Sequence, residues 1–339
     1  MVIPRPSLNK VYNSIARFLR MFAHLQMLPI LESGEETLVG GQAVMEGVMM
    51  RAPHSYCVAV RKPSGEMVTE EQAIQKVSEK YPLFKYPVLR GLGMLGQAMT
   101  LGYRALMFSA KAALHDQTNP AGEKPIEISS WMMTANLVFS LGFFIFLYKF
   151  VPLFLATRLG HVVPSLSGRF ATNMTDGVIR MVIFLTFLYL LSRMKDIRRV
   201  FEYHGAEHKV VFNFESRKPL SIENAQKFVT FHPRCGTSFL LVVMAISMVF
   251  YALLPFDGFL ARFLGRIALL PVITGVSYEL IRFAAKRQGT IMGLLTAPGL
   301  WLQRITTKPP DDTEVAVAIH ALEGAMSLEA RQGGELVIA

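Results

Sequence analysis

The sequence predicts a membrane α-helical bundle of about four transmembrane helices, joined to a small cytoplasmic α+β cap. Of its 339 residues, 52% are apolar and only 18% are charged, whereas soluble domains carry about 25% charged residues. Long uncharged segments follow one polar segment that has strand and turn patterns. Two cysteines are too few for a disulfide scaffold, and basic residues beside membrane spans explain the net charge of +10 without a specific nucleic-acid site.

Two segments precede the apolar region. Residues 1–35 form a basic amphipathic stretch, so we expect a helix on the inner membrane face or, as an equal alternative, a solvated helix. Residues 39–71 should form a cytoplasmic β-unit, because strand-like runs at 42–50 and 55–61 precede a turn at 62–65 and a short strand at 66–69.

Residues 87–114 are apolar but carry a polar residue at every seventh position. On a helix, these residues form one polar stripe: Arg90, Gln97, Arg104 and Lys111. A lipid-facing span would not keep three cations along one stripe. We therefore favour an amphipathic helix, in the membrane interface or packed on the bundle, over a membrane span.

Four segments have the composition of membrane spans: 128–156, 175–193, 235–256 and 263–284. The first has no charged residue for 21 positions and the third for 22 positions, enough to cross about 30 Å of hydrocarbon. The connection after the second span, counted over 193–235, holds nine lysines and arginines, far more than the outer connections. The positive-inside rule then predicts that both termini and this long connection lie in the cytoplasm.

The remaining segments are expected to be cytoplasmic or interfacial. Residues 194–234 should form an α/β loop, with a strand at 209–214 and a helix that Ser221 caps and that extends to Val229. Residues 290–307 read as an interfacial segment, broken at Pro298 and anchored by Trp301. Residues 311–328 read as a C-terminal helix, because Asp311 and Glu314 have capping-box spacing before an apolar face.

The chemistry of the chain is predicted to lie in the basic loop, in the run His204-Gly205-Ala206-Glu207-His208. Histidines four positions apart project from one face of a helix. Two neutral imidazoles can bind Zn²⁺, and an adjacent carboxylate can take a proton from metal-bound water. The same H-x-x-E-H pattern is used by inverted zinc peptidases. We therefore expect His204 and His208 as metal ligands and Glu207 as the catalytic base.

Two completions of this site stay open. Glu279, near the cytoplasmic end of the fourth span, is the third ligand of a catalytic site, since an ionisable residue there is a functional candidate. Alternatively His232 and Cys235 close a structural site with both histidines. Simple hydrogen bonding without any metal is the third possibility.

Other candidates lie nearby or in the β-unit. Glu46 and Arg51 interrupt an apolar, glycine-bounded strand pair and could reach the site, or could serve only the β-unit itself. Arg234 or Lys209 could stabilise developing negative charge. Both cysteines fall on the predicted cytoplasmic side, so thiols are expected and a disulfide is not.

These residues resemble the YqhQ-like family of bacterial multi-pass membrane proteins, whose function is uncharacterised. The matching stretches are GGQAVMEGVMMR at 40–51, YHGAEHK at 203–209, HPRCGTSF at 232–239, SYE at 277–279 and PGLWLQ at 298–303. Family members often have Ile where this chain has Met45. The resemblance implies a bacterial inner-membrane protein and carries the family's frequent label, a predicted metal-dependent enzyme.

Two functions from different classes follow. The first is a Zn²⁺-dependent hydrolase acting at the cytoplasmic membrane face. The second is a non-catalytic scaffold or assembly factor with a structural metal site or none. Its basic face would bind anionic lipid, a cytoplasmic protein or a ribosome. Membrane lipids are expected partners in both cases.

Overall fold

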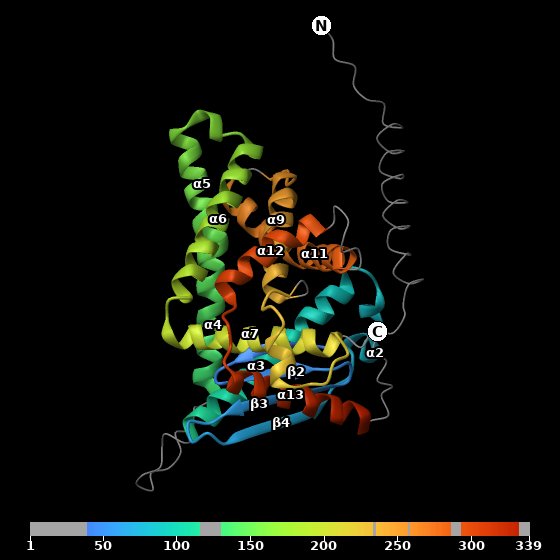
Figure 1. The fold of residues 1–339 in the computed structure, drawn as a ribbon. Coiled ribbons are helices and arrows are strands. Elements are labelled where there is room, and N and C mark those ends of the chain that lie inside the picture. The colour runs from blue at the N-terminus through green and yellow to red at the C-terminus, as the bar shows by residue number, and fades with distance from the viewer. Residues whose placement is uncertain (1–38, 116–129, 233–234, 257, 286–292, 332–339) are drawn as a thin grey trace.

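The fold joins a small antiparallel sheet to a set of apolar helices. The computed structural model describes residues 39–115, 130–232, 235–256, 258–285 and 293–331 (Figure 1). The predicted amphipathic segment 1–35 lies outside these residues. The sheet lies at one end of the molecule and the apolar helices extend away from it.

The sheet is a four-stranded meander in the order β1-β2-β3-β4. Its strands are β1 (Gly40–Val44), β2 (Gly47–Arg51), β3 (Ser55–Arg61) and β4 (Met67–Ala73). Register pairs Val44 with Gly47 at the first hairpin, where Glu46 takes a positive φ of 52°. The strands occupy the region where the sequence predicts a β-unit, and the last strand extends further, to Ala73.

Helices cover both faces of the sheet, so its central strands are apolar on both sides. Along β3, Cys57 and Ala59 contact α7 (Lys195–Glu215) and α13 (Asp312–Arg331). The alternate residues Tyr56 and Val58 pack with Leu101 of α3 (Leu89–His115). This alternation follows from the two-residue period of a strand. We call β1–β4 with α3, α7 and α13 the cap.

The helix α3 follows two short helices, α2 (Val77–Lys80) and the 3₁₀ turn η1 (Pro82–Lys85). Its seven-residue polar stripe makes contacts with neighbouring elements. Gln97 accepts a hydrogen bond from Arg51 at 2.7 Å, and Arg104 donates to Gln72 at 3.1 Å. This packing explains why an apolar helix carries cations along one side.

The apolar helices begin with α4 (Ser130–Ile145), a π-helical turn η2 (Phe146–Phe150) and α5 (Val151–Val162). A short 3₁₀ turn, η3 (Pro164–Leu166), leads to α6 (Arg169–Leu191). In the described residues, two stretches are long and apolar enough to span a membrane: Val138–Val162 and Arg169–Leu191. Their lengths are about 37 Å and 35 Å at 1.5 Å per residue.

The later apolar helices are shorter. They are α9 (Gly236–Ala252), α10 (Phe259–Ala268), α11 (Leu270–Ala285) and α12 (Gly293–Thr306). The pair α10–α11 bends by 47° and would be a third span if both helices cross together. The described residues therefore contain two or three candidate spans, and a fourth span at the 17-residue α9 stays a prediction.

Three sequence expectations were wrong in their local structure. Residues 209–214 are not a strand but belong to α7, because Tyr203, Ala206 and Val210 recur at helical spacing and pack into the cap core. The chain is not broken at Pro298 either, since α12 runs through it and packs against α9. Ser221 caps α8 (Ile222–Gln226), accepting from the Asn224 amide at 3.2 Å, but that helix ends before Val229.

The start of α13 is fixed by a capping box. Asp311 accepts from the Glu314 amide at 2.8 Å, while the Asp311 amide donates to the Glu314 carboxylate at 3.0 Å. Glu314 is almost fully buried, and this burial raises its pKa from 4.5 to about 7. Ionised Glu314 is therefore a cost to the folded state at neutral pH.

We predict that Glu314→Gln removes a loss of stability that the wild type suffers between pH 4.5 and pH 7. The pKa of Glu314 is higher in the folded chain than in the unfolded chain. The stability that protonated Glu314 contributes is therefore complete below pH 4.5 and is lost as the pH rises through 7. Glutamine keeps the capping acceptor. At pH 8 we expect the free energy of unfolding of Glu314→Gln to exceed that of the wild type by about 3 kcal/mol, because each unit of pKa difference corresponds to about 1.4 kcal/mol.

Unfolding of the full chain in detergent at pH 4.5 and pH 8 measures this difference. Glu323→Gln, at an exposed position on the same helix, is the matched control and should not change the pH slope. An unchanged slope in Glu314→Gln would contradict the assignment.

Candidate metal centre

The helix α7 lies across the end of the apolar helices, between them and the sheet (Figure 1). One side of α7 buries Tyr203, Ala206 and Val210 in the cap core. His204 and His208, four residues apart, face other parts of the chain: the end of α12 and the segment that precedes α9. The helical repeat of α7 thus places both imidazoles where cap and apolar helices meet.

Each histidine is oriented by a backbone carbonyl. The Nδ1 of His204 lies 2.8 Å from the Thr306 carbonyl, and the Nδ1 of His208 lies 2.5 Å from the Thr230 carbonyl. A carbonyl only accepts hydrogen bonds, so Nδ1 carries the proton in both neutral rings. Both Nε2 atoms are then left with a lone pair. This is the arrangement that orients histidines as metal ligands.

Cys235 completes a cluster of three donors. Its Sγ lies 3.2 Å from the Nε2 of His204, and the ligand atoms of His204, His208 and Cys235 all lie within 4.8 Å of one another. Cys235 occupies the N-cap position of α9, so the cluster sits at the cap end of that apolar helix. Two imidazoles and a thiolate are a donor set that suits Zn²⁺.

Glu207 lies beside this cluster. Its carboxylate is 3.5 Å from the Nε2 of His208 and 4.0 Å from the Nε2 of His204. The side chain is 8% exposed and touches the position where Gly41 would carry a Cβ. The Nε2 lone pairs of both histidines and the carboxylate of Glu207 therefore face one another in a buried space. A proton or a cation between them would stabilise this arrangement.

His232 lies next to the cluster but is held by other groups. Gln303 bonds both to its amide at 2.7 Å and to its carbonyl at 2.8 Å. Its Nε2 is 3.5 Å from Glu215, and its ring centroid is 5.6 Å from that of His208. Burial lowers the pKa of His232, and Glu207 opposes that shift.

The structure does not support Glu279 as the third ligand. Both of its carboxylate oxygens bond to Arg90, one of them at 2.6 Å, and the Val88 amide adds a bond of 3.3 Å. Glu279 is absent from the His204–His208–Cys235 group found among the described residues. Its carboxylate instead joins α11 to α3. Its partner, Arg90, belongs to the polar stripe of α3. The sequence alone did not predict this ion pair between α3 and α11.

The other candidates lie away from the cluster. Glu46 pairs with Arg199 and accepts from the Tyr203 hydroxyl at 3.3 Å. Arg51 donates to Gln97. Lys209 donates to two backbone carbonyls, of Gln226 at 2.8 Å and Phe228 at 2.6 Å. Glu46 and Arg51 thus join parts of the cap, and Lys209 joins α7 to residues 226–228. Arg234 lies outside the described residues.

The two cysteines differ in their surroundings. Both are free thiols, in agreement with the expectation that they form no disulfide. Cys57 is fully buried in the cap core, and this burial raises the pKa of its thiol to about 12. Cys235 is only half-buried and faces His204. Only Cys235 is placed to bind a metal.

Sequence reasoning missed the glycines and carbonyls that shape the site. A Cβ at Gly205 would lie 2.0 Å from the Lys308 carbonyl, and a Cβ at Gly41 would lie 2.7 Å from Cγ of Glu207. Lys308 in turn donates its amide to the Phe201 carbonyl at 2.8 Å. The glycines inside the GGQAVMEG and HGAEH runs were the available signal, since glycine within a helix often marks a close backbone approach.

Comparison with known proteins gives a family without a reaction. Residues 86–328 match the family model described as a protein of unknown function, DUF1385. The chain is 35% identical over 300 residues to the uncharacterized protein YqhQ of Bacillus subtilis (strain 168). That alignment covers 86% of this chain and 93% of the relative. No solved structure matches.

We predict that Gly205→Ala destabilises the chain by about 2–4 kcal/mol, because the new methyl group overlaps the Lys308 carbonyl and pushes α7 from the 306–310 segment. Gly96→Ala is the matched control: it lies on the exposed side of α3 with nothing within 4 Å of the added Cβ. It should be neutral or stabilising by about 0.5–1 kcal/mol. Thermal unfolding in detergent compares the two, and equal effects would refute the close approach.

Proposed function

The chain belongs to the DUF1385 family, whose function is unknown, and we propose that it is a multi-pass membrane protein with a zinc-dependent hydrolytic site. His204, His208 and Cys235 are the ligands, and Glu207 is the general base. The observation that carries the proposal is the pair of Nδ1–carbonyl bonds, which leaves both Nε2 atoms facing Cys235 and Glu207.

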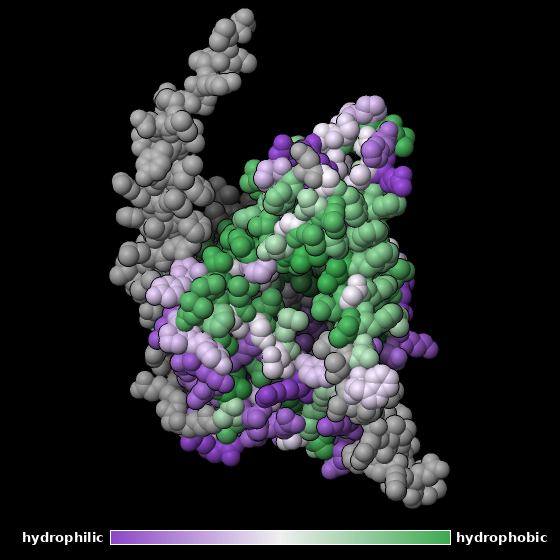
Figure 2. All heavy atoms as spheres, turned by 180° about the vertical axis from the view of Figure 1, so that it is seen from behind, coloured by the Kyte–Doolittle hydropathy of each residue, from purple (hydrophilic) through white to green (hydrophobic). Residues whose placement is uncertain are grey.

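The membrane placement is supported by the distribution of apolar surface. Figure 2 shows a broad hydrophobic zone across the middle of the described residues, with hydrophilic residues at its upper end and over the lower part, where Figure 1 has the sheet. Large apolar side chains are exposed along the long helices, among them Phe139, Phe146, Val178 and Leu190. Lipid would cover them. We propose four spans, α4–α5, α6, α9 and α10–α11, in the bacterial inner membrane.

The cap is assigned to the cytoplasm by its charge. The connection 193–235, which contains α7, holds nine lysines and arginines. Both termini then lie on the same side. Because Cys235 begins α9 and α7 crosses the ends of the helices, the zinc site would lie at the cytoplasmic membrane surface.

Three ligands favour a catalytic site over a structural one. Structural zinc sites have four protein ligands, whereas catalytic sites have three and keep one position for water. In this chain the three-residue group is accompanied by a carboxylate that faces both ligating nitrogens. His232, the candidate fourth ligand, has its Nε2 beside Glu215.

Each residue then has a definite role. Zinc would lower the pKa of bound water to about 7 and polarise the bond to be cleaved. Glu207 would accept the proton of that water and pass it to the leaving group. Thr306 and Thr230 would hold the imidazoles in the ligating tautomer through their carbonyls. The substrate class is one that reaches the membrane surface, such as a peptide.

A structural zinc site is the second candidate, since the His232 and His208 rings lie 5.6 Å apart and His208 is only 2% exposed. If His232 turned from Glu215 toward the cluster, the site would have four ligands, and the metal would fasten α7 to α9. The chain would then be a scaffold whose basic face binds anionic lipid, a protein or a ribosome. The two functions differ in what Glu207 does.

We predict one zinc per chain in wild type purified without chelator. His204→Ala, His208→Ala and Cys235→Ser should each lose it. Glu207→Gln should retain zinc and folding yet lose about 10²- to 10⁴-fold in activity, the usual effect of removing a general base. Elemental analysis measures the zinc content of each variant. Complementation of a strain lacking the gene reports whether the variant keeps its activity. Glu223→Gln, at an exposed position of α8, is the control.

The outcomes separate the two candidates. A fully functional Glu207→Gln together with zinc loss in His232→Ala would establish the structural site and end the hydrolase proposal. Wild type without zinc would contradict both metal sites.

The topology is predicted from charge asymmetry and tested separately. Ser165 and Lys218 are exposed and lie at opposite ends of the α6–α7 unit. A membrane-impermeant maleimide added to intact cells should label Ser165→Cys and not Lys218→Cys, with the wild type as background for Cys235. Labelling of Lys218→Cys alone would reverse the orientation.

A further inference from the structure

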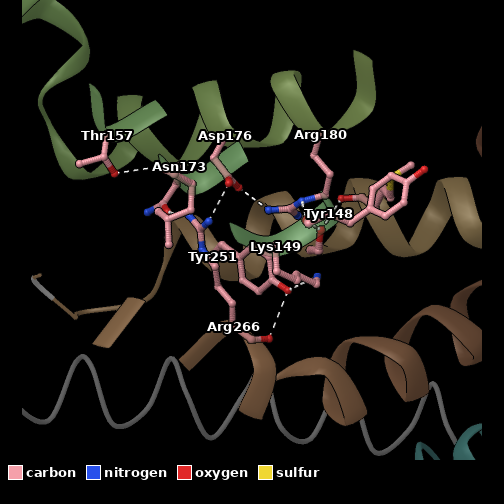
Figure 3. A network of polar contacts seen from close by, with 11 residues as sticks. Tyr148, Lys149, Thr157, Asn173, Asp176, Arg180, Tyr251 and Arg266 are labelled. Carbon is pink, nitrogen blue, oxygen red and sulfur yellow. Dashed lines mark hydrogen bonds and ion pairs between the residues drawn. The ribbon is translucent and has the colours of Figure 1, made fainter. Parts of the chain in front are cut away.

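A second polar centre lies among the apolar helices, away from the zinc site. Figure 3 shows Asp176 and Arg180 of α6, Arg266 of α10 and Lys149 of the π-helical turn grouped around Tyr251 of α9. Arg266 and Asp176 are 0% exposed, and Arg180 is 3% exposed. Along α6, Asp176 lies about 10 Å from the helix start and Arg180 about 16 Å. We propose that this cluster is an intramembrane binding site for a phosphate-class oxyanion.

The cluster carries more positive than negative charge. Asp176 pairs with both Arg180 and Arg266, the latter at 2.7 Å, and is the one acid in the cluster as described. Lys149 donates to the Tyr251 hydroxyl at 2.9 Å, which adds a third cation. Asp257 precedes α10 but lies outside the described residues. Uncompensated charge among apolar helices is costly, so a further anion would stabilise the folded chain.

All three cations of the cluster lie against the ring of Tyr251. The Arg180 and Arg266 guanidinium carbons each lie 5.1 Å from its centroid, and Lys149 Nζ lies 5.2 Å from it. The negative face of an aromatic ring attracts cations, but it carries no net charge. Tyr251 therefore gathers the three cations and leaves their charge available to a ligand.

The cluster also has a donor without an acceptor. Nε of Arg266 is buried and has no hydrogen-bond partner among the described residues. Its two terminal nitrogens donate to Asp176 at 2.7 Å and to Asn173 at 2.6 Å. A buried N–H that lacks an acceptor is uncommon and indicates a group that is not yet in place. An oxyanion supplies such an acceptor.

Lys149 is the most exposed cation of the cluster. It is half-buried, whereas both arginines and Asp176 are buried. It also lies in the π-helical turn, and such turns occur frequently at functional sites. We therefore expect a ligand of this cluster to contact the Lys149 ammonium.

Phosphate chemistry fits this set best. With Lys149 protonated, the three cations exceed the one carboxylate by two charges, which matches a phosphomonoester with close to two negative charges at neutral pH. Guanidinium groups and lysine are the usual donors to phosphate oxygens. A lipid headgroup such as phosphatidic acid and a soluble phosphate share this chemistry. The centre is separate from the zinc site, since Cys235 and Tyr251 lie 16 positions apart along α9, about 24 Å.

Two arms of one experiment distinguish the sources. The full-length chain is titrated with inorganic phosphate in neutral detergent, with sodium chloride at equal ionic strength as reference. In parallel, it is placed in nanodiscs of phosphatidylcholine with or without phosphatidic acid. We expect an increase in melting temperature in at least one arm, together with retained phosphatidic acid in native mass spectra if the lipid is the ligand.

Lys149→Met should raise the half-saturating concentration at least tenfold while preserving the fold, because Lys149 contacts Tyr251 and takes no part in the ion pairs of Asp176 with the two arginines. Arg158→Gln removes one positive charge from an exposed position of the same helical stretch and should respond as the wild type does. No response in either arm, an equal response to chloride, or an unchanged response in Lys149→Met would each overturn the proposal.

Discussion

The two hydrogen bonds from His204 and His208 to backbone carbonyls are the interactions on which the rest of the site depends. The acceptors lie in two separate segments: Thr306 is 102 positions from His204, and Thr230 is 22 positions from His208. Each bond fixes a tautomer and a ring orientation together, and so determines where the lone pairs of Nε2 point. Without them the same helix would carry two freely rotating imidazoles and no convergent donor set.

Those bonds are possible because the chain approaches α7 very closely. Gly205 leaves room for the Lys308 carbonyl on one side, and Gly41 of β1 leaves room for Glu207 on another. Packing of Tyr203, Ala206 and Val210 into the cap core holds the helix in that position. The proposed metal site is thus a meeting point of strand, crossing helix and apolar helix, and its stability is shared with the cap.

Helical periodicity and capping chemistry could be predicted from the sequence, because both depend on neighbouring residues. Asp311 and Glu314 form the expected capping box, and His204 and His208 share one helical face. Contacts between distant segments could not be predicted in the same way. Glu279 was a candidate ligand because it is an ionisable residue in an apolar segment, yet its carboxylate pairs with Arg90. The expected strand at 209–214 was wrong because strand propensity considers only the local residues. In the structure, Val210 and Val211 of this segment are buried on one face of α7 against the sheet.

X-ray absorption at the zinc edge counts the ligand types of the metal without any assumption about activity. For wild type loaded with one equivalent of zinc, we expect one sulfur at about 2.3 Å and three nitrogen or oxygen ligands at about 2.0–2.1 Å. The sulfur shell should disappear in Cys235→Ser and persist in Cys57→Ala, whose thiol is buried in the cap core. A coordination shell with nitrogen and oxygen only in the wild type would contradict the His204–His208–Cys235 site.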